Sequence, residues 1–218
     1  KRPWKRVLKQ KYTMSIKSKN IIQFSPIRSG STLVYNILRE FSNVRKTHNM
    51  SVKNGQLYVI TYRHPYNCII SSLLRNEKKI NLLNIKSEIS EYLKNGGKDL
   101  LKNDLLKKNI LLLQYEEFFD NYEVIYNKLE KFLNINIDEN KKIELSKKYH
   151  ITNVKKITNK YKTFKGYDKT THLHGKHISE YDGKTDYKKI LSENDIYMLK
   201  ENKSLNEIIK KFNYELWD

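Results

Sequence analysis

Short apolar runs alternate with amphipathic segments along the first two thirds of the chain. Residues 20–25, 57–62 and 109–114 have the composition of buried strands, and residues 43–48 fit a less apolar strand. The run 109–114, NILLLQ, has consecutive apolar residues, as expected of a strand that is covered on both faces. Strands that alternate with helices predict an α/β fold, a three-layer sandwich around a central, mainly parallel sheet.

Helical periodicity follows most of these strands. Five helical segments are predicted. The first has a buried stripe from Leu33 to Phe41, and the second begins at Pro65. The third covers 81–108 with a break at Gly96 and Gly97, the fourth runs from Glu116 through Leu133, and the last has a buried stripe from Leu205 to Phe212. Pro65 suits the first turn of its helix, because the missing N–H has no helical partner there.

Two segments lack a clear period. Residues 1–19 are basic and are predicted to form an N-terminal arm. Residues 150–188 are polar, basic and aromatic, and a loop of this length in a compact domain is usually functional. We therefore expect residues 150–188 to be a lid or substrate loop. The chain has no Pro-, Gly- or Ser-rich linker, so residues 1–218 are predicted to form a single domain.

Polar side chains follow all four predicted strands. The first strand runs into SPIRSGST, the second into Lys46-Thr47-His48, the third into Arg63 and the fourth into Tyr115. In open parallel sheets, ligands bind outside the carboxyl ends of the strands. These residues are therefore expected to line one site.

The turn after the first strand has the composition of an anion cradle. Ser29, Gly30, Ser31 and Thr32 are small, and they precede a helix whose first amides have no helical acceptor. Arg28 adds a positive charge. An ordinary strand–helix turn with Ser/Thr capping is the alternative interpretation. The turn lacks the lysine of a Walker A loop, and no strand ends in an aspartate, so the anion would be neutralised by Arg, Lys and His without a metal.

The chain is strongly basic, with a formal net charge of +19 at pH 7. Such a charge favours polyanionic partners: nucleic acid, an acidic membrane surface, a glycan or a phosphate-rich cofactor. A solvated lysine-rich surface without function is the alternative. Cys68 is the only cysteine, which excludes an intrachain disulfide and favours a reducing compartment such as the cytoplasm. No apolar run reaches the length of a membrane span, and an upstream targeting segment stays open because the sequence begins at Lys1.

In combination, these motifs resemble those of the sulfotransferases that use 3′-phosphoadenosine 5′-phosphosulfate (PAPS). IRSGST is similar to the family's 5′-phosphosulfate loop, and RHPYNCIIS has the arginine, proline and serine of its 3′-phosphate motif at Arg63, Pro65 and Ser71. Lys46-Thr47-His48 resembles the K-T-H tripeptide of cytosolic members, and Tyr115-Glu116-Glu117 a later Y-E-D motif. The likeness covers residues 20 to about 135 and is loose beyond them.

The resemblance implies sulfuryl transfer from PAPS to a hydroxyl or amine, with adenosine 3′,5′-bisphosphate (PAP) as the product and no metal. It implies that His48 is the general base, that Arg28 holds the leaving phosphate and that Lys46 assists at the sulfonate. The implied donor-binding residues are Arg28, Ser29, Gly30, Ser31, Thr32, Leu33, Arg63, Ser71 and Tyr115, with Thr152, Lys176, His177 and Lys184 as weaker candidates. Leu33 stands where cytosolic members have a tryptophan beside the adenine, and the interval from the loop to His48 is shorter than in those enzymes.

Three other interpretations are weaker. A nucleic-acid-binding protein could use the basic surface, but the basic residues are dispersed and no binding motif occurs, so no nucleic-acid partner is expected. A P-loop kinase would need the Walker lysine and a metal-binding aspartate. HLHGKH, residues 172–177, could bind zinc, although no carboxylate or cysteine stands at customary spacing. The acceptor itself is not identified by the sequence: a small alcohol, a phenol, a glycan and a tyrosine would all fit.

Overall fold

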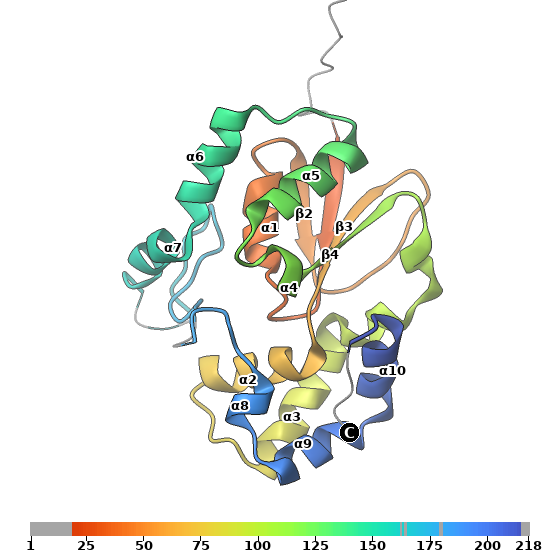
Figure 1. Cartoon of the computed structure of the whole chain (residues 1–218), viewed down its shortest axis with the longest axis vertical. Helices are drawn as coiled ribbons and strands as arrows, with labels where there is room; N and C mark the ends of the chain where they lie inside the picture. The colour runs from red at the N-terminus through yellow and green to blue at the C-terminus, as the bar shows by residue number, and fades with distance from the viewer. Residues whose placement is uncertain (1–18, 162, 164, 179–180, 215–218) are drawn as a thin grey trace, which may run out of the picture.

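A central sheet of four parallel strands organises the fold in the computed structural model, which describes residues 19–161, 163, 165–178 and 181–214. The strands are β1 (Asn20–Phe24), β2 (Asn43–Thr47), β3 (Leu57–Tyr62) and β4 (Ile110–Gln114). Their spatial order is β2-β1-β3-β4, and every neighbouring pair is parallel. The predicted α/β fold with a parallel sheet is confirmed (Figure 1).

One face of the sheet packs against α1 (Ser31–Leu38), α5 (Tyr122–Leu133) and α6 (Glu139–Tyr149). Because side chains alternate along a strand, Ile21 of β1 and Val59 of β3 point into this layer. Leu129 and Leu133 of α5 are fully buried in it. This layer therefore fixes α1, and with it the loop that precedes α1.

The opposite face packs against α2 (Pro65–Arg75), α3 (Leu82–Tyr92), α9 (Glu193–Lys200) and α10 (Lys203–Lys211). Phe24 of β1 and Tyr58 of β3 point into this second layer, so each face of the sheet is covered by a layer of helices. None of the described helices is long and apolar enough to cross a membrane.

Two predicted helices are interrupted. The course from Glu116 divides into α4 (Tyr115–Phe118) and α5, with residues 119–121 between them. The course over 81–108 is α-helical only in α3, and a π-helical turn (Leu93–Gly97) and two 3₁₀ turns (Lys98–Leu101 and Asn103–Leu106) follow. Gly96 has a φ of 103°, and a Cβ there would lie 3.0 Å from the carbonyl oxygen of His48. The interruption thus lets this segment approach the end of β2.

The segment 150–188 is not a loop throughout. It begins with α7 (Ile151–Thr158), and its last two residues belong to α8 (Tyr187–Ile190). Only residues 159–186 lie between these helices, and 162, 164, 179 and 180 are outside the described residues. We refer to the described residues of this stretch, 165–178 and 181–185, as the lid segment. Of the predicted arm, only Lys19 is described, and residues 1–18 lie outside the description.

Candidate functional site

A pocket of about 510 Å³ lies at the carboxyl ends of the strands. It is lined by the loop after β1, by residues 46–48 at the end of β2, by Arg63 after β3 and by Tyr115 after β4. The lid segment and α7 contribute the opposite wall. The parallel sheet thus brings together polar residues from four separate parts of the sequence, as predicted from the strand ends.

The loop between β1 and α1 has a tightly constrained backbone. Arg28 and Gly30 have φ values of 62° and 80°, in the left-handed region. A Cβ at Gly30 would lie 2.6 Å from the ring of Tyr115, so only glycine fits there without a shift of that ring. Ser29 Oγ donates to the carbonyl of Pro26 at 2.8 Å, which braces the loop from within.

Helix α1 begins with Ser31 and has no side-chain cap. The N–H of Val34 donates to the carbonyl of Gly30 and makes the first helical hydrogen bond. The amides of Ser31, Thr32 and Leu33 precede that bond, so the helix offers them no acceptor. These amides, at the positive end of the helix dipole, can bind an anion.

Three cationic side chains converge on this loop. Arg28 Nε donates to Ser71 Oγ at 3.0 Å, and Lys46 Nζ donates to Thr32 Oγ1 at 2.9 Å. The guanidinium of Arg63 lies over the Tyr115 ring, 4.3 Å from its centroid. Burial and the neighbouring charges of Arg75 and Arg63 lower the pKa of Arg28 to about 10, and burial lowers the pKa of Lys46 to about 8. Like charges in a desolvated site raise the free energy of the charged forms, and an anion would relieve that cost.

Carboxylates do not offset these charges. No Asp or Glu lines the pocket among the residues that the structure describes. Within the same residues, Arg28, Lys46 and Arg63 take part in no ion pair. Arg63 is only 4% exposed, and its Nε has no hydrogen-bond partner. The donor set therefore fits a ligand with more than one negative group.

The lid segment contacts the arginines through its backbone. Arg28 donates to the carbonyl of His177, and Arg63 Nη2 donates to the carbonyls of Gly183 and Thr185, both at 3.1 Å. Tyr115 donates its hydroxyl hydrogen to the same Gly183 carbonyl, at 3.0 Å. The lid segment is thus held over the pocket by the residues that line its floor.

His48 has a defined orientation. Its Nδ1 lies 2.7 Å from the carbonyl oxygen of Ser25, so Nδ1 carries the hydrogen and donates it. Burial and the charges of Lys46 and Arg75 hold the pKa of His48 below its usual value, against the opposing effect of the Ser25 contact. The ring is therefore neutral at pH 7, with a lone pair on Nε2 that can accept a proton.

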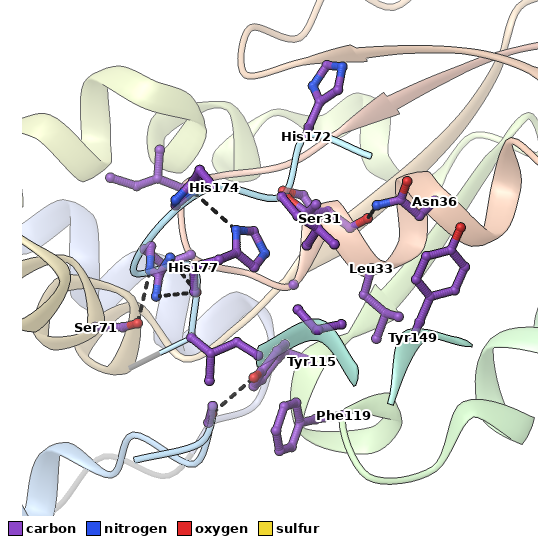
Figure 2. A pocket seen from close by; sticks show the side chains of 18 of the residues that line it. Ser31, Leu33, Asn36, Ser71, Tyr115, Phe119, Tyr149, His172, His174 and His177 are labelled. Atoms are coloured by element: carbon purple, nitrogen blue, oxygen red, sulfur yellow. Dashed lines mark hydrogen bonds between the residues drawn. The ribbon is translucent and has the colours of Figure 1, made fainter. Parts of the chain in front are cut away.

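The other end of the pocket is apolar. Leu33 of α1, Tyr149 at the end of α6, and Ile151 and Val154 of α7 line it, together with Phe119. Figure 2 shows Leu33, Tyr149 and Phe119 grouped away from His172 and His174. The pocket thus combines an apolar slot with a cationic centre and a histidine-rich end.

Most of the predicted site residues meet in this pocket. Those that line it are Arg28, Gly30, Ser31, Thr32, Leu33, Lys46, His48, Arg63, Ser71, Tyr115 and His177. Four others do not line it. Ser29 is buried behind the loop, the amide of Thr152 donates to His150 Nδ1, Lys176 pairs with Glu77, and Lys184 pairs with Asp120.

Several lining residues were not foreseen as donor-site residues. They are Ile27, Asn36, Thr47, Arg75, Phe119, Tyr122, Tyr149, Ile151, Val154, Tyr167, His172, Leu173, His174, Ile178 and Gly183. Asn36 is buried and donates to the carbonyls of Thr32 and Thr171, which ties α1 to the lid segment. The spacing of Ile151 and Val154 was a usable signal for a helix against the site. His172 and His174 had been considered only for zinc, and no group of three or more metal-ligating side chains occurs in the described part of the chain.

Among the comparisons with known proteins, the one with solved structures bears on the fold. No protein-family model and no curated protein sequence matches the chain. The solved structures that are similar include mouse sulfotransferase SULT7A1 complexed with PAP, and retinol dehydratase in complex with androsterone and the inactive cofactor PAP. The first is 11% identical over 89% of this chain and 85% of that one, and the second 12% identical over 91% and 82%. Both give a TM-score of 0.58, and the chain therefore has the sulfotransferase fold.

Proposed function

We propose that the chain is a sulfotransferase that moves a sulfuryl group from PAPS to an acceptor hydroxyl or amine, with His48 as the general base. The observation that carries this proposal is the convergence of Arg28, Lys46 and Arg63 in a pocket without a lining carboxylate. PAPS carries a phosphate at one end of its ribose and a phosphosulfate at the other. A metal-free site must neutralise both groups with cations and amides.

The residues divide among the parts of the donor. The amides at the start of α1, with Arg28 and Lys46, would hold the 5′-phosphosulfate, and Arg63 and Ser71 the 3′-phosphate. The apolar slot of Leu33, Ile151 and Val154 offers flat contact for adenine, which replaces the stacking that a tryptophan would give. In this arrangement the sulfuryl group would lie between Arg28 and His48.

The chemistry requires little beyond positioning and charge. The acceptor oxygen bonds to sulfur as the bridging oxygen leaves with its electron pair on the 5′-phosphate. His48 Nε2 takes the acceptor proton, and Arg28 stabilises the charge that develops on the leaving phosphate. Preorganised donors of this kind commonly supply the largest part of a rate enhancement.

Thermal denaturation with PAP and with ATP tests this proposal directly. PAP is expected to raise the Tm of the protein without added Mg²⁺, because binding to the native state stabilises it by mass action. ATP, which lacks the 3′-phosphate, should raise the Tm much less. Stabilisation by ATP with Mg²⁺ but not by PAP would instead favour a kinase.

Arg63→Ala is expected to weaken PAP binding by about 2 to 4 kcal/mol, the scale for a charge-assisted contact in a desolvated site. Titration calorimetry measures the loss as about a 30- to 1,000-fold rise in Kd. Arg63→Lys keeps a positive charge and should recover part of the affinity. Arg45→Ala, at an exposed position of β2 outside the pocket, is the matched control. Equal affinities for the Arg63→Ala and Arg45→Ala variants would refute the assignment.

The affinity for PAP is expected to fall as the pH rises from 7 to 9. Burial lowers the pKa of Lys46 to about 8, and a bound anion raises it again, so above pH 8 binding must take up a proton. The expected loss is about tenfold across this range, the ratio of protonated Lys46 at the two pH values. Lys46→Arg stays charged throughout, and in calorimetry its affinity should be nearly independent of pH. The same slope in both proteins would rule out Lys46 as its source.

A further inference from the structure

Four histidines surround Lys46 at the end of the pocket that contains His48. The charge of Lys46 contributes to a lowered pKa at each of them: His48, His172, His174 and His177. His48 directly follows β2 and the other three belong to the lid segment, and all four line the pocket. At pH 7 the end of the pocket where the acceptor would bind is therefore lined by neutral imidazoles and not by a charged cluster.

Hydrogen bonds define which ring nitrogens remain for a ligand. His174 Nδ1 lies 2.7 Å from the carbonyl of Gly175 and donates to it, so His174 Nε2 is an acceptor. His177 Nδ1 lies 3.1 Å from that Nε2 and donates its hydrogen. The ring nitrogens of His172 have no hydrogen-bond partner among the described residues. A neutral imidazole offers one donor and one acceptor, which matches hydroxyl groups.

Charge argues against an amine. A protonated amine acceptor would need a carboxylate, and none lines the described part of the pocket. The phosphate and phosphosulfate of the donor would already neutralise Arg28, Lys46 and Arg63. The acceptor end therefore selects by hydrogen bonding and shape, not by net charge.

The aromatic ring of Tyr167 is exposed at the edge of the pocket. Tyr167 is 51% exposed and lines the pocket, and its ring centroid lies 6.5 Å from that of His172. His172 in turn packs against Tyr35 at 5.0 Å. Hydrogen bonds hold the turn that contains Tyr167 and His172, because Asp168 accepts from the amides of Thr170 and Thr171.

Aliphatic side chains line both ends of the pocket: Leu33, Ile151 and Val154 around the adenine slot, and Leu173 between His172 and His174. An apolar alcohol such as a steroid has a single hydroxyl for His48, and it would leave the ring nitrogens of His172 without a hydrogen-bond partner. A sugar presents a face of C–H groups for a tyrosine and hydroxyls for imidazoles.

We infer that the acceptor is a hydroxyl group of a saccharide, seated against Tyr167 and His172 with the reacting oxygen at His48 Nε2. The inference rests on the proposed sulfotransferase function. The hydroxyl oxygen bonds to sulfur, the bond from sulfur to the bridging oxygen of the donor breaks, and the hydroxyl proton moves to His48. The bridging oxygen leaves with the electron pair as part of PAP.

The test is transfer of labelled sulfate from PAPS to five acceptors. The acceptors are N-acetylchitotriose, an oligosaccharide that contains uronate, 4-nitrophenol, androsterone and an acidic peptide with one tyrosine. Label on at least one saccharide, with a kcat/KM above that for each of the other three acceptors, is expected.

Two results would overturn the inference while leaving the proposed function standing: label on the phenol, steroid or peptide but on neither saccharide, or stabilisation by PAP with no labelled saccharide. Failure of PAP to stabilise the protein, together with no labelled acceptor, would reject both proposals. The PAP measurement therefore separates the two failures.

Tyr167→Ala provides a second readout. It is expected to raise KM for the saccharide about tenfold, the equivalent of one lost aromatic contact, while kcat and the Kd for PAP stay near their original values. Tyr181→Ala is the matched control, because Tyr181 also belongs to the lid segment and is 40% exposed but does not line the pocket. Equal KM values for the two variants would show that Tyr167 does not contact the acceptor and would overturn the inferred binding position.

Discussion

Replacing His48 with alanine is expected to lower kcat for sulfuryl transfer by about 10²- to 10⁴-fold, the range for loss of a general base. The Kd for PAP should stay nearly unchanged, because His48 would contact the acceptor and not the bisphosphate. Labelled-sulfate transfer under saturating PAPS measures the first quantity, and calorimetry with PAP the second. A variant with the original kcat would reject the assignment.

His48→Asn separates the base from its structural contact. The asparagine amide can still donate to the carbonyl of Ser25, which His48 Nδ1 approaches at 2.7 Å, but it offers no basic nitrogen. Both variants should therefore be equally inactive, and the Asn variant should retain the Tm of the original protein. Activity in His48→Asn would mean that the histidine acts only through its position.

The pH profile gives an independent check on the same residue. Burial and the charges of Lys46 and Arg75 lower the pKa of His48, so the unprotonated base is the main form at neutral pH. The rate should fall as the pH drops through that pKa, since protonation removes the Nε2 lone pair. We expect the rise in kcat/KM to be centred below pH 6.5, the ordinary histidine value, and a rise centred above pH 7 would point to another group.

The floor of the pocket was predictable because it depends on local sequence. Each strand is a short run followed at once by its polar residues, so the strand ends could be placed without knowledge of the packing. Once the strands are parallel, Arg28, Lys46, Arg63 and Tyr115 must lie at one edge of the sheet. The parallel direction of the strands was therefore enough to predict that these residues share one site.

The walls of the pocket were not predictable in the same way. Tyr149 and Val154 reach the site through the packing of α6 and α7, and His174 through a segment without regular structure. Their positions depend on contacts between residues far apart in the chain, such as the hydrogen bond from Asn36 to Thr171. No period or motif in the sequence encodes such a contact.

The helix boundaries were misjudged where the site interrupts a helix. Phe119 and Tyr122 continue the apolar spacing of a helix, yet the helix is interrupted at residues 119–121 and Phe119 lines the pocket. Gly183, with a φ of 82°, closes against the same ring, since a Cβ at this position would lie 2.4 Å from Phe119. Local propensity is overridden here by the packing of the lid segment.

Arg28→Met is expected to lower kcat by about 10²- to 10³-fold, the scale for loss of one preorganised group that stabilises developing charge. Arg28 lies within the loop between β1 and α1, beside the amides of α1, where charge would develop on the leaving phosphate. Arg28→Lys keeps the charge but loses the planar fork that contacts Ser71 and His177, so it should recover only part of the rate.

The same substitution should not destabilise the fold as an ordinary buried-residue change would. Burial and the charges of Arg75 and Arg63 lower the pKa of Arg28, so its charged form is disfavoured in the native protein. Removing the charge relieves this repulsion and offsets the lost hydrogen bonds to Ser71 and His177. We therefore expect a Tm close to or above that of the original protein, together with the loss of kcat. Residues retained for catalysis often lower the stability of the native protein. A large fall in Tm with an unchanged rate per folded molecule would therefore show that Arg28 has a structural and not a catalytic role.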